Sequence, residues 1–320
     1  VTDESGIGQL YRYDGQSCRP LPRIDADLGL PPWNFGIASF VIDASQRLWA
    51  ACTARKDGQV FLASPGARGW SRMPLEAVGL TRLAGVAGGV AGLMSRTEAA
   101  TALVSCATAA AAPAVVVRTG AERGLDPRYV SRAEPVRFRS IDGETSHGLY
   151  YPPAHPDRRP SAKRQPPALV LAHGGPTASA GRGLSPRIQF YTSRGFAVLD
   201  VDYAGSTGYG RAYRERLDGR WGIADVADCA GAARFLASSG HADATRIAIA
   251  GGSAGGYTVL MALATSDAFA AGSSHYGISD LSLLMEHTHK FESGYLHRLL
   301  GTSPRAWKRV CRERSPLTLI

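Results

Sequence analysis

The sequence predicts an α/β protein in which a doubly wound sheet follows a partial β-propeller. Short β-type runs, separated by turn residues, recur with a period of about fifty within residues 1–125. From residue 168 onward, apolar runs alternate with helical segments, as in parallel sheets. A serine flanked by two pairs of glycines lies where one of these runs meets a helix.

The length and composition favour two folded domains. The 320 residues exceed the usual size of one domain, and 44% of them are hydrophobic. We expect a partial propeller over 1–125 and an α/β domain over 126–320. The Ala-rich window 100–117 contains Ser, Thr and a proline, so it predicts a strand, a turn and a strand rather than a membrane span.

The charge and cysteine patterns exclude several classes of function. The net charge of +9 is scattered, and the dense basic run 156–167 is interrupted by prolines, so no nucleic-acid surface is expected. Five cysteines lie far apart without a Cys-x-x-Cys pair, which argues against zinc sites and a disulfide framework. We therefore expect a cytoplasmic protein with no metal or cofactor.

The first domain repeats a simple plan. "GQLYRYDG" at 8–15 recurs as "GQVFLASPG" at 58–66, and the strand, turn and strand of 38–52 have a counterpart at 88–106. A repeat of short strands at this period is typical of propeller blades. A fragment of an ordinary β-sandwich is the alternative.

The second domain begins with a predicted hairpin, "PVRFRS" followed by "SHGLYYPP". Four apolar runs are expected to be parallel strands covered on both faces: Ala168–Gly175, Phe196–Tyr203, Arg246–Gly252 and Phe269–Gly277. A helix is predicted over 225–240, with Asp225 at an N-cap-like position and Gly240 as its stop. A second helix follows the serine.

The candidate nucleophile is Ser253. Gly251-Gly252-Ser253-Ala254-Gly255 satisfies G-x-S-x-G between a predicted strand and a predicted helix, the context that this motif requires. A sharp strand-to-helix turn leaves no room for side chains at Gly251 and Gly255. The helix that follows directs its free N–H groups toward the centre where negative charge develops.

A second glycine-rich turn, His173-Gly174-Gly175-Pro176, ends an earlier predicted strand. Its two glycines allow a backbone N–H to approach a substrate oxygen closely. Together with the serine turn, it predicts an oxyanion hole.

These motifs resemble a known family. "LAHGGP", "DVDYAGSTGYGRAYRERLDGRWGIADVADC" and "RIAIAGGSAGGYTVL", in this order, resemble the catalytic domain of the prolyl oligopeptidase family, closest to its acylaminoacyl peptidase and dipeptidyl aminopeptidase-like branch. The resemblance covers 136–320 and implies an α/β-hydrolase domain behind a β-propeller. It implies Ser253 as nucleophile and the N–H groups of Ala254 and Gly175 as oxyanion donors, with His173 where some branches have a tyrosine.

The implied function is that of a serine peptidase that hydrolyses short peptides through an acyl-serine. Substrates are then short peptides, and a homo-oligomer of the full-length protein is left open. An esterase of the same fold and a catalytically degenerate propeller-hydrolase binding protein are the alternatives. The Gly-rich segment 204–211 lacks the spacing of a phosphate-binding loop. The basic surroundings of Cys311 would lower the pKa of a thiol, but no His–Asn pair accompanies it.

A serine nucleophile also needs a general base and a carboxylate that orients the base. In this fold they follow the serine in the order Asp, His, and each further strand–helix unit takes about 30 residues. Only 67 residues (320 − 253) follow Ser253. The resemblance implies that both partners lie beyond Ile320, so the chain is expected to be a fragment with little activity alone. Four later histidines are the alternative bases within the chain: His275, His287, His289 and His297.

Overall fold

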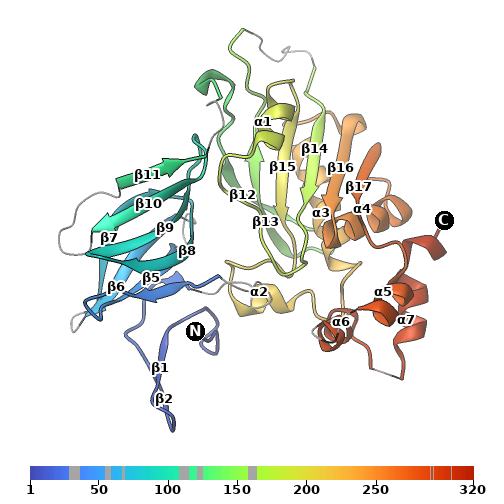
Figure 1. The fold of residues 1–320 in the computed structure, drawn as a ribbon. Helices are drawn as coiled ribbons and strands as arrows, with labels where there is room; N and C mark the ends of the chain where they lie inside the picture. The colour runs from blue at the N-terminus through green and yellow to red at the C-terminus, as the bar shows by residue number, and fades with distance from the viewer. Residues whose placement is uncertain are drawn as a thin grey trace. The chain divides into compact units, whose positions relative to one another are not determined.

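A computed structural model of the chain describes residues 1–28, 37–54, 59–66, 69–107, 115–120, 125–157, 164–288, 290, 292–303 and 305–320. The chain forms two compact units, and Figure 1 shows their helices and strands. The first unit comprises Val1–Pro127, Gly181–Ser185 and Thr207–Ala212. The second comprises Arg128–Ala180, Pro186–Ser206 and Tyr213–Ile320.

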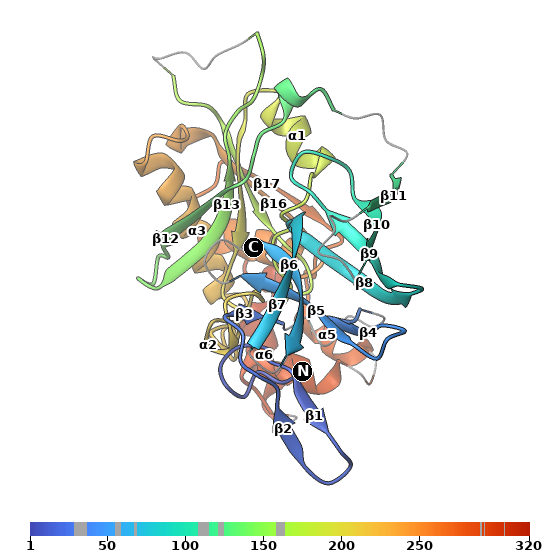
Figure 2. The same ribbon diagram turned by 90° about the vertical axis from the view of Figure 1, so that its left-hand side faces the viewer.

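The first unit contains two blade-like antiparallel sheets, whose strands are labelled in Figure 2. One has the order β3-β5-β6-β7, with β4 also paired to β5, and the other has the order β11-β10-β9-β8. A separate hairpin joins β1 (Tyr11–Tyr13) to β2 (Cys18–Pro20). The sheets are built from β3 (Ala26–Asp27), β4 (Phe40–Ile42), β5 (Leu48–Ala54), β6 (Val60–Gly66), β7 (Gly69–Ala77), β8 (Gly79–Val86), β9 (Gly89–Ser95), β10 (Ala102–Ala107) and β11 (Val115–Thr119).

Both sheets contribute to one apolar cluster, which includes Leu62 and Met73 from the first sheet and Val90 and Val104 from the second. This mutual burial explains why neither set of short strands needs a helix to cover it. The two predicted strand–turn–strand segments are β4 with β5 and β9 with β10. Within the Ala-rich window, β10 and β11 pair as antiparallel strands, and 108–114 lie outside the described residues. No helix in the described part of the chain has the length and hydropathy to cross a membrane.

The second unit is organised around a six-stranded mixed sheet with the order β12-β13-β15-β14-β16-β17. The predicted hairpin is β12 (Glu134–Arg139) and β13 (Thr145–Tyr151). The four expected parallel strands are β14 (Ala168–Ala172), β15 (Ala197–Asp202), β16 (Ile247–Gly252) and β17 (Ala271–His275). Ala172 lies in register with Val201 and Gly251, so the carboxyl ends of three strands meet at one edge. In doubly wound sheets this edge carries the functional site.

Helices cover both faces of this sheet (Figure 1). Alternate strand residues such as Leu199 and Ile249 pack in a cluster with α3 (Ala224–Ser238) and α4 (Ala254–Thr265). Val198, on the opposite face, packs with α1 (Pro186–Thr192). The remaining helices are α2 (Arg211–Glu215), α5 (Leu281–His287), α6 (Ser293–Leu300) and α7 (Trp307–Arg314).

Two expectations differ from the structure. Strand β17 exposes Ala271, Gly272, Ser273 and His275, because it is the edge strand of the described sheet and pairs only with β16. The prediction that it is covered like its neighbours is therefore wrong for this edge.

Asp225 is not the N-cap of α3, since Ile223 occupies that position. The Asp225 carboxylate is fully buried in the first turn, where it accepts hydrogen bonds from the Gly222 N–H at 2.7 Å and from the Thr258 hydroxyl at 2.6 Å. Asp225 thus joins the backbone just before the helix to a hydroxyl of α4, without occupying the N-cap position. The predicted stop is present: Gly240 has a φ of 71°, just after the helix ends.

Candidate active site

The backbone of Ser253 makes the turn from β16 into α4. Its φ is 55° and its ψ is −122°, a conformation that residues with a side chain rarely adopt. The Ser253 N–H donates to the carbonyl oxygen of His275 at 3.0 Å, and the Ser253 carbonyl accepts from the N–H of Tyr257 at 3.0 Å. Ser253 is exposed. The turn therefore presents a hydroxyl to solvent at the carboxyl edge of the sheet.

The glycines on both sides of Ser253 are required by close backbone approaches. A Cβ added to Gly251 would lie 2.5 Å from the carbonyl oxygen of Gly255 and 2.8 Å from that of Ala172. A Cβ added to Gly255 would overlap the same Ala172 oxygen and lie 2.7 Å from the oxygen of His173. Strand β14, its following loop and the serine turn can pack this closely only without side chains at these two positions.

The glycine pair after β14 lies directly against the serine turn. A Cβ on Gly174 would be 3.1 Å from the Gly252 oxygen and 3.5 Å from the Ser253 Cβ, and Gly175 has a φ of 56°. Within the described residues, the N–H groups of Gly175 and Ala254 donate to no other residue. Two backbone N–H groups near the carboxyl edge of the sheet, one of them at the N-terminus of α4, are therefore left without an acceptor among the described residues.

His173 fixes the loop that carries one of these donors. Its Nδ1 lies 3.0 Å from the Gly174 carbonyl oxygen, its Nε2 lies 2.7 Å from the Ser206 Oγ, and its ring stacks on Tyr203 at 4.2 Å. Burial lowers the pKa of His173 to about 4, so the ring is neutral at pH 7. The Gly174 carbonyl and the Gly175 N–H belong to one planar peptide, so a contact to the carbonyl also orients the N–H.

A second contact holds the same loop from α6. The Oγ1 of Thr177 and the phenolic oxygen of Tyr295 are 2.9 Å apart, and Thr177 is buried. The two residues are separated by 118 positions, so no local pattern could have predicted that they meet. Tyr295 is the site residue that the sequence reasoning missed.

The described histidines among the alternative bases do not contact the Ser253 hydroxyl. His275 is exposed, and its Nε2 lies 3.3 Å from the Ser273 Oγ. His287 is exposed at the end of α5, His297 is half-buried in α6, and His289 lies outside the described residues. No histidine among the described residues is hydrogen-bonded to the Ser253 hydroxyl.

Other candidate chemistry is not supported by the geometry. Burial raises the pKa of the Cys311 thiol to about 11, so the expectation that its basic surroundings lower this pKa is wrong. Burial also raises the pKa of Cys229 well above its ordinary value. Among the described residues, no group of three or more His, Cys, Asp or Glu side chains is arranged to hold a metal ion.

The chain is similar to a family of known proteins. The model of the prolyl oligopeptidase family matches residues 182–314. Dipeptidyl aminopeptidase BIII of Pseudoxanthomonas mexicana is 34% identical over 191 residues, which are 58% of this chain and 28% of the relative. The acylamino-acid-releasing enzyme of Mus musculus is 37% identical over 124 residues, which are 39% of this chain and 16% of that enzyme.

Solved structures match nearly the whole chain. A crystal structure of puromycin hydrolase has a TM-score of 0.91 and 34% identity, and the match covers 99% of this chain and 48% of that one. A puromycin-hydrolyzing peptidase of Mycobacterium tuberculosis has a TM-score of 0.92 and 34% identity, with the same coverage of both chains. The chain thus spans about half the length of these solved relatives and a smaller share of the curated ones.

Proposed function

Because the chain belongs to the prolyl oligopeptidase family, we propose that Ser253 is the nucleophile of a serine peptidase that cleaves short peptides. The observation that carries the proposal is the strained turn at Ser253. An exposed hydroxyl stands there, and the backbone N–H groups of Ala254 and Gly175 have no acceptor among the described residues. Strain of this kind is maintained where a side chain must be held for chemistry.

The reaction follows from these groups. The Ser253 oxygen attacks the carbonyl carbon of the scissile bond, and the carbonyl oxygen becomes an oxyanion. The N–H groups of Ala254 and Gly175 donate to this oxyanion, and one such donor is worth about 100- to 1,000-fold in rate. A general base takes the proton of the Ser253 hydroxyl during the attack and returns it to the leaving nitrogen as the bond to the amine breaks. Water then releases the acyl group from Ser253 in a second step.

A neutral serine hydroxyl also needs a base, which must be oriented by a carboxylate. No described histidine is hydrogen-bonded to the Ser253 hydroxyl. We propose that the base and its carboxylate lie beyond Ile320, as the family resemblance implies. The 320-residue chain alone is then expected to be nearly inactive. We assign His173 a supporting role, because its two ring nitrogens already contact the Gly174 carbonyl and the Ser206 hydroxyl.

The relatives' names support a proposal for the substrate class. They include a dipeptidyl aminopeptidase and acylamino-acid-releasing enzymes. We propose that the substrates are short peptides from which an amino-terminal dipeptide or an acylated residue is removed.

The test compares the 320-residue chain with a longer form that continues past Ile320. Both are treated with a fluorophosphonate probe and assayed on acyl-peptide, aminoacyl-nitroanilide and short-chain ester substrates, with Ser253→Ala as the control in each form. We expect the longer form to be labelled at Ser253 and to cleave the peptide substrates. Strong labelling of the 320-residue chain would show a working base within it, and activity on esters alone would favour an esterase. Activity that survives Ser253→Ala would remove the assignment of the nucleophile.

A further inference from the structure

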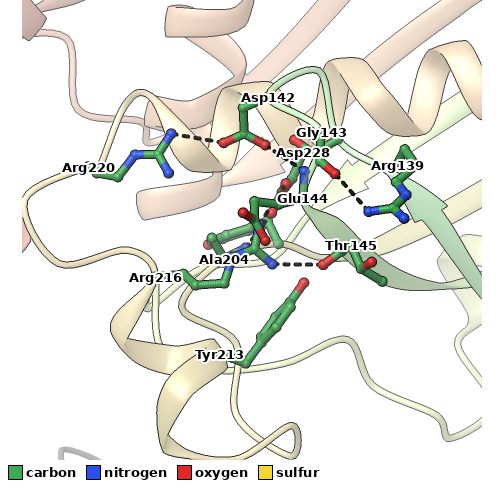
Figure 3. A network of polar contacts seen from close by, with 12 residues as sticks. Arg139, Asp142, Gly143, Glu144, Thr145, Ala204, Tyr213, Arg216, Arg220 and Asp228 are labelled. Carbon is green, nitrogen blue, oxygen red and sulfur yellow. Dashed lines mark hydrogen bonds and ion pairs between the residues drawn. The ribbon is translucent and has the colours of Figure 1, made fainter.

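A side chain from the loop after β15 lies against the ring of His173. Ser206 is completely buried, and its Oγ lies 2.7 Å from the His173 Nε2. The backbone of this loop is held by α3, because the Ala204 N–H donates to the Asp228 Oδ2 at 2.6 Å (Figure 3). The Tyr203 hydroxyl donates to the His173 carbonyl at 2.7 Å. The loop after β15 therefore contacts both the backbone and the ring of His173.

The Gly174 carbonyl decides which ring nitrogen of His173 carries a hydrogen. Its oxygen lies 3.0 Å from Nδ1. A carbonyl oxygen can only accept, so Nδ1 must be the donor of this contact. A hydrogen on Nε2 alone would leave two acceptors facing each other at this distance. Burial lowers the pKa of His173 to about 4, so the ring is neutral at pH 7 and holds one hydrogen, which lies on Nδ1.

The hydroxyl of Ser206 has one proton and two acceptors within reach. Its Oγ lies 2.7 Å from the His173 Nε2 and 2.7 Å from the Tyr203 carbonyl oxygen. Since Nε2 carries no hydrogen, the first contact is a hydrogen bond only if the hydroxyl donates to it. The Tyr203 carbonyl does not depend on the hydroxyl, because the Ser206 backbone N–H donates to it at 3.0 Å.

We propose that Ser206 is a positioning residue for the oxyanion donor: its hydroxyl donates to the His173 Nε2, and the Nδ1–H of the same ring donates to the Gly174 carbonyl. This carbonyl and the Gly175 N–H belong to one planar peptide, so the two hydrogen bonds set the direction of the N–H. Donation to the carbonyl also polarises the peptide and strengthens its N–H as a donor. The catalytic consequence rests on the proposed function, whereas the hydrogen bonds themselves do not.

The first test observes the ring by NMR and needs no activity. The 320-residue chain is labelled with ¹⁵N at its histidines, and His173→Gln identifies the signals of His173 at pH 7. We expect a hydrogen on Nδ1 and an Nε2 resonance shifted by an accepted hydrogen bond. In Ser206→Ala this resonance should move toward that of a free ring nitrogen. A hydrogen on Nε2 in the natural chain, or an Nε2 resonance that Ser206→Ala leaves unchanged, overturns the proposal whether or not a longer form cleaves peptides.

The second test measures kcat and KM in the longer form that continues past Ile320. Loss of one oxyanion donor costs about 100- to 1,000-fold in kcat, and a misdirected donor retains part of this effect. We therefore expect Ser206→Ala to lower kcat about tenfold and to leave KM unchanged. Ser131→Ala is the matched control, because it removes a buried serine hydroxyl that donates to the Pro152 carbonyl at 2.6 Å. Pro152 follows β13, which runs antiparallel to β15, so this control lies at the opposite edge of the sheet and should keep its kcat.

A double variant shows whether Ser206 acts through the ring. In a His173→Gln background, Ser206→Ala should cause no further loss of kcat, because the link to Gly174 is already broken. Losses that multiply in the double variant, or a kcat of Ser206→Ala equal to that of Ser131→Ala, contradict the positioning role. A longer form without activity that depends on Ser253 would remove the peptidase function and the positioning role with it, while the NMR signals would still decide the hydrogen bond.

Discussion

The backbone N–H of Ser253 donates to the carbonyl oxygen of His275 at 3.0 Å, so β17 holds the residue whose φ is 55°. The N–H of Tyr257 holds the Ser253 carbonyl on the other side at the same distance. Both peptide groups that flank the Ser253 Cα are thus restrained by neighbouring elements. This arrangement explains how an unfavourable backbone conformation persists in the folded chain.

The first prediction concerns this strain. Ser253→Ala keeps a side chain at the strained position, whereas Ser253→Gly removes the Cβ that makes a positive φ costly. We expect Ser253→Gly to have a free energy of unfolding about 1 kcal/mol higher than Ser253→Ala, after the greater flexibility of glycine in the unfolded state is included. Urea unfolding of the two variants measures the difference. Equal stabilities would mean that the turn is relaxed.

The second prediction concerns the close packing at Gly255. Gly255→Ala forces a Cβ onto the carbonyl oxygens of Ala172 and His173, so β14 and the serine turn must separate. We expect a loss of about 1–3 kcal/mol in the free energy of unfolding, as in other overpacked sites.

Gly181→Ala is the matched control for this substitution. A Cβ at Gly181 would have nothing within 4 Å, so we expect a change within about 0.5 kcal/mol. If Gly255→Ala is as stable as Gly181→Ala in thermal and urea unfolding, the close approach of β14 to the turn is not present in solution.

Local patterns in the sequence were sufficient to predict the parallel strands and the helices around Ser253. Apolar runs such as Ala168–Ala172 are buried on both faces, and a strand that is buried on both faces needs apolar residues at every position. The same reasoning was wrong for β17. Its composition resembles that of a covered strand. Its exposure, however, depends on its position at the edge of the described sheet, which composition does not reveal.

Contacts between segments that are distant in the sequence also could not be predicted from local patterns. Asp225 resembles an N-cap in the sequence because it precedes an apolar helical run. In the structure its carboxylate accepts a hydrogen bond from the hydroxyl of Thr258, which is 33 positions away. Thr177 and Tyr295 meet because α6 packs near the loop after β14, and the pairing follows from tertiary packing rather than from spacing. Burial likewise outweighs basic neighbours at Cys311, since desolvation of a thiolate exceeds the attraction of charges on the surface.

The third prediction concerns the pH dependence of stability. Burial lowers the pKa of His173 to about 4, below the value of about 6.5 expected in the unfolded chain. Between these values the unfolded state binds more protons, so stability is complete above pH 6.5 and is lost as the pH falls toward 4. The loss attributable to one histidine is at most about 1.4 kcal/mol per pH unit.

Urea unfolding at pH 7 and at pH 5 tests this prediction. His173→Gln should lose less stability between the two pH values than the natural chain does, because glutamine does not titrate. The pKa of His147 is also lowered to about 4, mainly by burial, so His147→Gln should reduce the pH dependence similarly. If the natural chain and His173→Gln have the same pH dependence, the pKa of His173 is not lowered by folding.

The fourth prediction concerns the hydrogen bond between Thr177 and Tyr295. Thr177→Ser keeps the hydroxyl, whereas Thr177→Val and Tyr295→Phe each remove one partner of the 2.9 Å contact. We expect each of the latter two to lower the free energy of unfolding by about 1 kcal/mol, and the double variant to lose clearly less than their sum. Unfolding of the four proteins of this cycle isolates the pair from the other contacts of Thr177. Strictly additive losses would show that the two hydroxyls do not interact. The hydrogen bond between α6 and the loop that carries Gly175 would then not form in solution.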